Sequence, residues 1–210
     1  MEDDDSLRPK VVVKSVKRVF NGFLKIDEAT FNLQRYDGSI AKDVKRLSLE
    51  RGDSAGAILL DCGAPGSPTA EARIWLVEQF RYSTYEKGPG WILELPTGVI
   101  EDGDDPAETV RREVREEAGL EAVKLELIAT VYVTPGGSSE RIFIYFGRVD
   151  GQEPPRMESL GVRAEGEDIR LVACPAKEFI RRARLGDIDD AKTLIAGLWL
   201  GAHWDRVSKP

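Results

Sequence analysis

Three glutamates are crowded together in the segment AETVRREVREEAGL, residues 107–120, which has the sequence pattern of a helix. Because each residue turns a helix by about 100°, Glu113, Glu116 and Glu117 fall on one side of it, where like charges cost roughly 0.2–0.5 kcal/mol per pair. A hard divalent cation would remove this repulsion, and magnesium is commonly held by one or two carboxylates together with substrate phosphates. The spacing therefore indicates a candidate magnesium site for phosphate chemistry. The alternative is an ordinary charged helix face in solvent.

Signals for both ends of this helix flank the glutamates. Asp105 is placed as the N-cap, Pro106 takes the first helical position, and Glu108 lies three residues after the cap, as in a capping box. Gly119 is placed as the C-terminal cap. Apolar residues at helical spacing predict the face that enters the core, and these are Ala107, Val110, Val114 and Ala118.

The stretch GVIEDGDDPAETVRREVREEAGL, residues 98–120, resembles the Nudix box, whose family pattern is G-x5-E-x7-R-E-U-x-E-E-x-G-U, with U a bulky apolar residue. Asp104 replaces the first glutamate of the pattern, which keeps the charge but shortens the side chain by one methylene. The matching residues are Gly98, Arg112, Glu113, Val114, Glu116, Glu117, Gly119 and Leu120. This resemblance favours the metal-site interpretation over the ordinary charged helix.

The rest of the chain, about residues 11–204, resembles bacterial ADP-ribose and nucleotide-sugar pyrophosphatases, through segments such as VEQFRY, WILELPTG, TPGGSSERI and EGEDI. Pro135 lies fifteen positions after Leu120, and a proline there accompanies ADP-ribose hydrolysis in this family. The implied activity is Mg²⁺-dependent hydrolysis of ADP-ribose to AMP and ribose 5-phosphate, with Mn²⁺ as the other candidate metal. Two alternatives stay open: a pyrophosphatase for GDP-mannose or another nucleotide sugar, and a non-catalytic Nudix-fold nucleotide sensor.

The resemblance also implies a role for individual residues of the metal site. The metal ligands would be the backbone carbonyl of Thr97 with Glu113, Glu116 and Glu117. Arg112 and Glu116 are assigned to catalysis as well. The general base for the attacking water would come from the EGEDI segment, where Glu165 and Glu167 are the candidates. The alternative for this acidic, glycine-containing segment is a mobile surface loop.

The substrate contacts implied by the resemblance lie outside the helix. Arg81 would hold the substrate phosphates, and its alternative is a strand arginine paired with a carboxylate. Glu140 would lie near the diphosphate, and its alternative is an ordinary loop charge. The complete set of implied substrate-binding residues is Arg81, Glu94, Gly98 and Glu140. Candidates for stacking on the base are Trp91, Phe31 and Tyr36, with core packing as the alternative for each.

The remaining pattern predicts the elements that carry these residues. Residues 1–10 are acidic and are predicted to be a disordered leader, and residues 11–53 alternate as strands of a β lobe. Residues 54–210 would form the catalytic domain, with strands at 55–60, 73–82, 91–100, 125–135 and 141–149 and two late helices. The predicted fold is a Nudix-type α/β/α sandwich of the α+β kind. In relatives the N-terminal lobe exchanges between subunits, which implies a homodimer.

Composition excludes several other classes of function. The single histidine, His203, argues against a histidine-based triad or a multi-histidine zinc site. A net charge of −7 argues against sequence-independent nucleic-acid binding. No apolar run approaches a membrane span, and the acidic N-terminus is unlike a secretion signal, so we expect a cytoplasmic protein with no membrane partner. Cys62 and Cys174 are interpreted as free thiols.

Overall fold

The computed structural model describes residues 8–63, 71–122, 124–152 and 168–209. The chain divides into two compact units, of which the first runs up to Gly52 and also includes Thr134–Glu140, while the second holds the rest. Residues 1–7 of the predicted leader lie outside the described residues, and Lys10 already bonds to Gln34. No helix in these ranges is both long and apolar enough to span a membrane.

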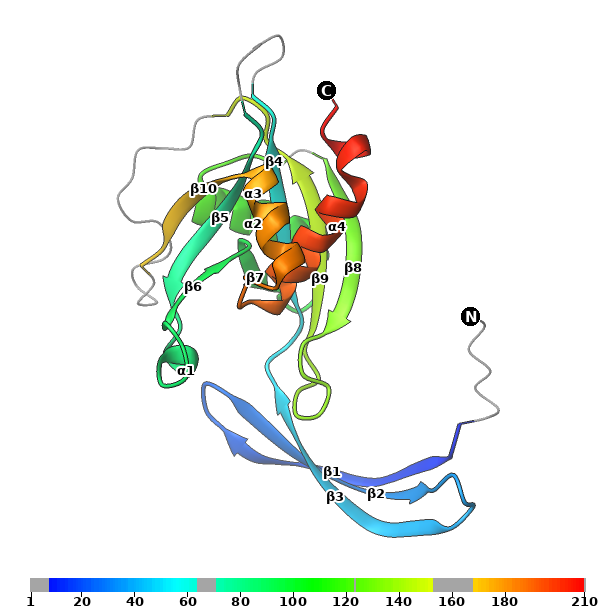
Figure 1. The fold of residues 1–210 in the computed structure, drawn as a ribbon. Coiled ribbons are helices and arrows are strands. Elements are labelled where there is room, and N and C mark those ends of the chain that lie inside the picture. The colour runs from blue at the N-terminus through cyan, green and yellow to red at the C-terminus, as the bar shows by residue number, and fades with distance from the viewer. Residues whose placement is uncertain (1–7, 64–70, 123, 153–167, 210) are drawn as a thin grey trace. The chain divides into compact units, whose positions relative to one another are not determined.

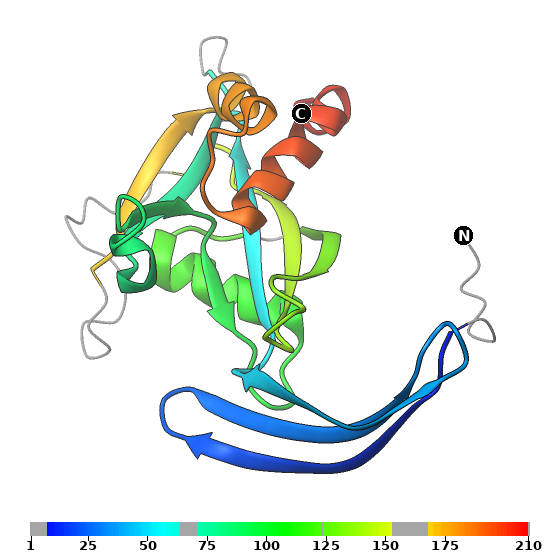
Figure 2. The ribbon, with the colours of Figure 1, turned by 60° about the horizontal axis from the view of Figure 1, so that its bottom comes forward.

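The first unit contains a three-stranded antiparallel sheet. Its strands are β1 (Val11–Asn21), β2 (Lys25–Gln34) and β3 (Ile40–Glu50), in the order β1-β2-β3. They match the strands predicted from alternation, and they curve together as one ribbon (Figure 2). None of the strand residues is buried, which is unusual because a sheet normally packs one face against a second layer.

The second unit is a sheet covered by helices on both faces. Its strands are β4 (Ser54–Asp61), β5 (Arg73–Phe80), β6 (Trp91–Glu94), β7 (Thr97–Val99), β8 (Leu125–Tyr132), β9 (Arg141–Arg148) and β10 (Arg170–Pro175). The main order is β10-β5-β4-β9-β8, with β6 paired to β5 and β7 to β4. The helices are α1 (Tyr82–Tyr85), α2 (Pro106–Ala118), α3 (Ala176–Leu185) and α4 (Ala191–Val207). In Figure 1, α2 covers one face and α3 with α4 the other, so the predicted α/β sandwich is confirmed.

Strand β4 runs between the two helical layers, and all of its residues are buried. Ala55 and Ala57 pack in the cluster beneath α2, with Val110, Val114 and Ala118. Ile58 and Leu60 pack in the other cluster, which holds Phe179 of α3 and Leu200 of α4. Burial on both faces explains why the sequence AGAILL has no polar alternation.

The predicted strand over 91–100 is divided in the structure. Pro96 has no backbone N–H to donate to a ladder, and the chain bends at Leu95–Pro96, so that β6 pairs with β5 while β7 pairs with β4. This bend presents Thr97 and Gly98 to α2, and it is the structural feature on which the candidate site depends.

The predicted helix at the C-terminus is present as α4. The face of α4 that is buried is not the face with the largest apolar side chains. Leu198 is 46% exposed, while the buried positions include Ala196, Gly197 and Leu200. A β-carbon at Gly197 would lie 2.7 Å from that of Ala183 in α3, so the two helix backbones approach closely there. Small residues permit this contact, and a pattern of large apolar residues does not reveal it.

Candidate active site

The predicted caps fix helix α2 in place. The Asp105 side chain accepts hydrogen bonds from the N–H groups of Ala107 (2.8 Å) and Glu108 (3.3 Å). Gly119 ends the helix with a left-handed backbone, φ 63°. The capping box predicts that the Glu108 carboxylate accepts a hydrogen bond from the Asp105 N–H. In the structure this carboxylate pairs with Arg111 instead, so only the Asp105 half of the capping box is formed. The helix therefore begins and ends at defined residues, which fixes the positions of its glutamates along the helix axis.

Two of the box glutamates lie against the backbone of the β6–β7 bend. Glu113 and Glu117 are only 9% and 5% exposed. Glu117 Oε2 accepts a hydrogen bond of 3.1 Å from the Thr97 N–H. The Glu113 carboxylate lies so close to Gly98 that a β-carbon there would collide with it. The structure thus brings together four residues that the sequence assigned to one site, from segments about fifteen to twenty residues apart.

Arg112 and Glu116 lie at the exposed side of this group. Arg112 Nη1 is 2.8 Å from Glu113 Oε1 and 3.6 Å from Glu116 Oε2, so one guanidinium bridges both carboxylates. Its Nη2 lies 3.5 Å from the carbonyl of Val99 on β7. Glu116 is the most exposed of the three glutamates, with 45% of its side chain accessible. Arg112 therefore offsets the like charges that the spacing predicted.

The donor set fits a hard divalent cation that is completed by its substrate. In the described part of the chain, no three His, Cys, Asp or Glu side chains converge into a ready-made metal cage. Two nearly buried carboxylates beside a backbone segment are instead what magnesium uses when phosphates and waters supply its other ligands. Gly98 supports this fit, because the absence of its side chain lets the Glu113 carboxylate approach the backbone.

Arg81 and Glu94 form an ion pair near the same bend. Arg81 Nε and Nη2 lie 2.8 and 2.7 Å from Glu94 Oε1. Glu94 is 3% exposed, and its other oxygen accepts a 2.5 Å hydrogen bond from Lys192 Nζ. Arg81 is thus held by a buried carboxylate and remains 43% accessible at its side chain. Its contact with substrate phosphate stays a prediction.

Other predicted site residues lie elsewhere or outside the described residues. Glu165 and Glu167 fall in the undescribed range 153–167. Glu140 belongs to the first unit, where Arg51 Nε is 3.6 Å from its carboxylate. Trp91 is half-exposed and packs edge-on against Phe80, with 5.8 Å between ring centroids. Asp104 and Tyr36 are exposed, Tyr36 by 92%. Phe31 is partly buried on β2.

Sequence reasoning did not assign Lys192 or Thr193, which bond to the strand end at Glu94 and Leu95, or Asp190, which accepts hydrogen bonds from both of them. One signal was available in the motif DDAKT. A lysine in the first turn of a helix opposes the positive end of the helix dipole, so its presence there indicates a specific acidic partner. That partner, Glu94, is ninety-eight positions away.

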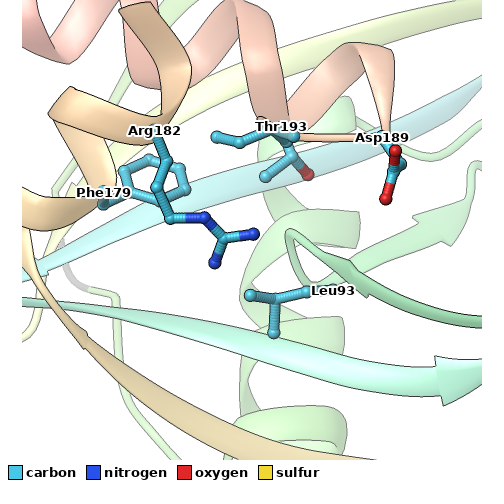
Figure 3. Close-up of a pocket in the computed structure, with 6 residues that line it drawn as sticks. Leu93, Phe179, Arg182, Asp189 and Thr193 are labelled. Carbon is cyan, nitrogen blue, oxygen red and sulfur yellow. The ribbon is translucent and has the colours of Figure 1, made fainter. Parts of the chain in front are cut away.

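A small pocket lies behind this strand end, between α3, α4 and β6. It has a volume of about 30 Å³, roughly the share of one water molecule in the liquid. Figure 3 shows Arg182 reaching toward Leu93, with Thr193 and Asp189 nearby. Ligand pockets typically measure about 300–1,000 Å³, so this cavity is too small for a nucleotide sugar, and the candidate site remains at the α2 face.

Comparison with known proteins assigns the class to which this fold and site belong. Residues 51–195 match the NUDIX domain, so the chain belongs to the Nudix family, and the resemblance seen in the box is confirmed. It is 32% identical to the ADP-ribose pyrophosphatase of Escherichia coli (strain K12), over 88% of this chain and 85% of the relative. It is 28% identical to the GDP-mannose pyrophosphatase of Salmonella arizonae, over 85% and 88%. The ADP-ribose pyrophosphatase of Haemophilus influenzae is 27% identical, over 91% and 86%.

Proposed function

We propose that the protein is a cytoplasmic, Mg²⁺-dependent pyrophosphatase that hydrolyses ADP-ribose to AMP and ribose 5-phosphate. The observation that carries this proposal is the pair of nearly buried carboxylates, Glu113 and Glu117, held on the Thr97–Gly98 backbone. The same two glutamates belong to the REVREE segment, which matches the Nudix box at every position, and relatives named ADP-ribose pyrophosphatase match most of the chain.

The residues would divide the work of diphosphate hydrolysis as follows. Glu113 and Glu117, with the Thr97 carbonyl and Glu116, would hold the divalent metal, which neutralises phosphate charge and acidifies water when bound. Arg112 would keep Glu113 and Glu116 paired and oriented. Glu165 or Glu167 would take the proton of the attacking water. The water oxygen then bonds to one phosphorus while the bridging P–O bond breaks and the other phosphate leaves.

Arg81 would orient the diphosphate. Its guanidinium uses Nε and Nη2 on one oxygen of Glu94, and within the described part of the chain Nη1 makes no hydrogen bond. An arginine held in this way loses little conformational entropy when it binds phosphate, and its Nη1 remains available as a donor to a phosphate oxygen. Glu94 would therefore act on substrate through Arg81, while Glu140 and Gly98 complete the set of proposed substrate contacts.

GDP-mannose or another nucleotide sugar is the second candidate substrate, because relatives named GDP-mannose pyrophosphatase also match 85% of the chain. The distinguishing experiment measures kcat/KM for ADP-ribose, GDP-mannose and UDP-glucose at the same Mg²⁺ concentration. We expect ADP-ribose to exceed the other two by about tenfold or more, equivalent to about 1.4 kcal/mol of transition-state binding. A higher kcat/KM for GDP-mannose would replace the proposed substrate. Tight binding without turnover of any of the three would support the nucleotide sensor instead.

We also expect a homodimer formed through the first unit. Val13, Phe31 and Val44 face each other across the three strands of its sheet, and paired residues of this kind share one face. Val11 and Val16 lie on the same face, and both are more than half-exposed. A second copy of the chain would bury this valine patch, defined here as Val11, Val13, Val16, Phe31 and Val44.

Val13→Asp is predicted to break this dimer. A charge in a buried apolar patch is costly to desolvate, so sedimentation equilibrium should shift from about twice 23.3 kDa toward 23.3 kDa. Val12→Asp is the matched control, because Val12 is equally exposed on the opposite face of the same strand. A native protein that sediments as a monomer, or a dimer unaffected by Val13→Asp, would contradict the assignment.

A further inference from the structure

The first turn of α4 is hydrogen-bonded to the strand end that leads into the candidate site. Asp190 caps the helix, accepting from the Thr193 N–H at 3.0 Å and from the Thr193 hydroxyl at 2.6 Å. The same hydroxyl accepts a 3.0 Å hydrogen bond from the Leu95 N–H. Thr193 and Leu95 are both 1% exposed, so water does not compete for either group. The hydroxyl proton therefore points to Asp190, and its lone pair to Leu95.

The chain of hydrogen bonds continues from Leu95 to the box glutamates. The Leu95 carbonyl accepts a 2.9 Å hydrogen bond from the Thr97 hydroxyl, and the Thr97 N–H donates to Glu117. The Thr97 side chain is confined, because it fills the space that a β-carbon at Gly56 would occupy. One connected path thus runs from Asp190 on one face of the sheet to Glu117 on the other.

Lys192 forms a second connection from the same turn. Its Nζ lies 2.5 Å from Glu94 Oε2 and 3.1 Å from Asp190 Oδ1, and the residue is 8% exposed. With Arg81 on the other oxygen of Glu94, the group contains two cations and two carboxylates. Their charges balance, as a nearly buried cluster requires. Both halves of the proposed diphosphate site, the metal end and the Arg81 end, are therefore connected to the first turn of α4.

We propose that Thr193 is a positioning residue for the metal end of the diphosphate site. Its hydroxyl fixes the Leu95–Thr97 bend, and the bend in turn fixes the Thr97 backbone against Glu117 before a metal arrives. Groups behind metal ligands set the orientation of those ligands and hence the affinity for the ion. The proposal rests on the proposed function, because it takes Glu117 and the Thr97 carbonyl as metal ligands. The competing explanation is that Thr193 only completes the cap of α4.

The test compares Thr193→Val, which removes the hydroxyl and keeps the branched shape, with Thr193→Ser, which keeps the hydroxyl. The primary readout is the dissociation constant for Mn²⁺, measured by electron paramagnetic resonance on protein without substrate. Thr193→Val should weaken Mn²⁺ binding by about 10- to 100-fold, the range for groups behind metal ligands. Thr193→Ser should bind Mn²⁺ with the affinity of the native protein. With ADP-ribose and Mg²⁺, we expect Thr193→Val to raise the Mg²⁺ concentration for half-maximal rate while KM at saturating Mg²⁺ changes little.

Thr109→Val is the matched control. Thr109 lies on α2 itself and is 1% exposed, and its hydroxyl has no hydrogen-bond partner among the described residues. Loss of that hydroxyl should leave Mn²⁺ affinity unchanged. Thr97→Val provides a second test if Thr193→Val folds poorly, because it breaks the next hydrogen bond of the path and leaves the cap of α4 intact.

The outcomes separate this proposal from the proposed function. A Thr193→Val protein that melts at a lower temperature but binds Mn²⁺ as the native protein does would show that the residue is only a helix cap. Native protein that binds Mn²⁺, with the expected effect of Thr193→Val, but cleaves none of the nucleotide sugars would overturn the proposed function alone. Native protein that binds no Mn²⁺, either alone or with ADP-ribose present, would overturn both.

Discussion

Replacing Glu117 by Gln is expected to reduce metal-dependent turnover of ADP-ribose by on the order of 10²–10³-fold, because the amide removes one anionic ligand from a site with two nearly buried carboxylates. Such a loss corresponds to about 3–4 kcal/mol of transition-state stabilisation. The amide has nearly the same size, and its oxygen can still accept from the Thr97 N–H. Steady-state kinetics and Mn²⁺ titration should therefore report the loss of charge rather than a loss of fold.

Glu121→Gln is the control for this substitution. Glu121 lies just beyond the same helix, and its carboxylate pairs with Arg115 at the surface. Exposed pairs of this kind contribute roughly 0–1 kcal/mol, so kcat should stay within about twofold of the native value. Equal activity of the Glu117→Gln and native proteins would remove Glu117 from the metal site and reopen the interpretation of α2 as an ordinary charged helix.

Replacing Gly98 by Ala is expected to be nearly as damaging, although it adds a single methyl group. The added β-carbon would collide with the Glu113 carboxylate and the atoms behind it. Because the helix is fixed by its caps and its buried valines, the carboxylate must move rather than α2. Displacing one ligand by about 1 Å is enough to cost about 100-fold in rate. Activity and Mn²⁺ affinity should fall together while the far-UV circular dichroism stays native.

Gly88→Ala is the matched control for Gly98→Ala. Its β-carbon would meet only the Thr84 carbonyl, at an ordinary contact distance of 3.5 Å, and Gly88 does not need a positive φ. We expect native activity from this variant. A fully active Gly98→Ala protein would mean that activity does not depend on the position of Glu113 against the β6–β7 bend. Glu116, rather than Glu113, would then be the proposed partner of Glu117 in binding the metal.

The parts of the site that sequence predicts well are local. The caps Asp105 and Gly119, the buried face of α2 and the approach of its glutamates to Gly98 all depend on residues within one continuous stretch. A helix period and fixed motif spacing determine such contacts almost without reference to the rest of the chain. The sandwich itself was predictable for the same reason, since its strands and helices have clear periods.

The parts that sequence predicts poorly depend on contacts between distant segments. Nothing near Glu94 indicates that Lys192 and Arg81 will share its carboxylate. Strand β10 was not predicted, because RLVACP is short and its pairing with β5 is non-local. The bend at Pro96 was visible as a proline but not as a change of partner strand. In each case the deciding interaction is with a residue far along the chain, which a local pattern does not contain.

The most direct measurement is phosphorus nuclear magnetic resonance of ADP-ribose incubated with the native protein, first with Mg²⁺ and then with excess chelator. The proposed function predicts that the diphosphate signals are replaced by those of AMP and ribose 5-phosphate in equal amounts, and that chelator stops the reaction. Persistence of the diphosphate signals with Mg²⁺ present, under conditions in which ADP-ribose is bound, would contradict hydrolysis at this site.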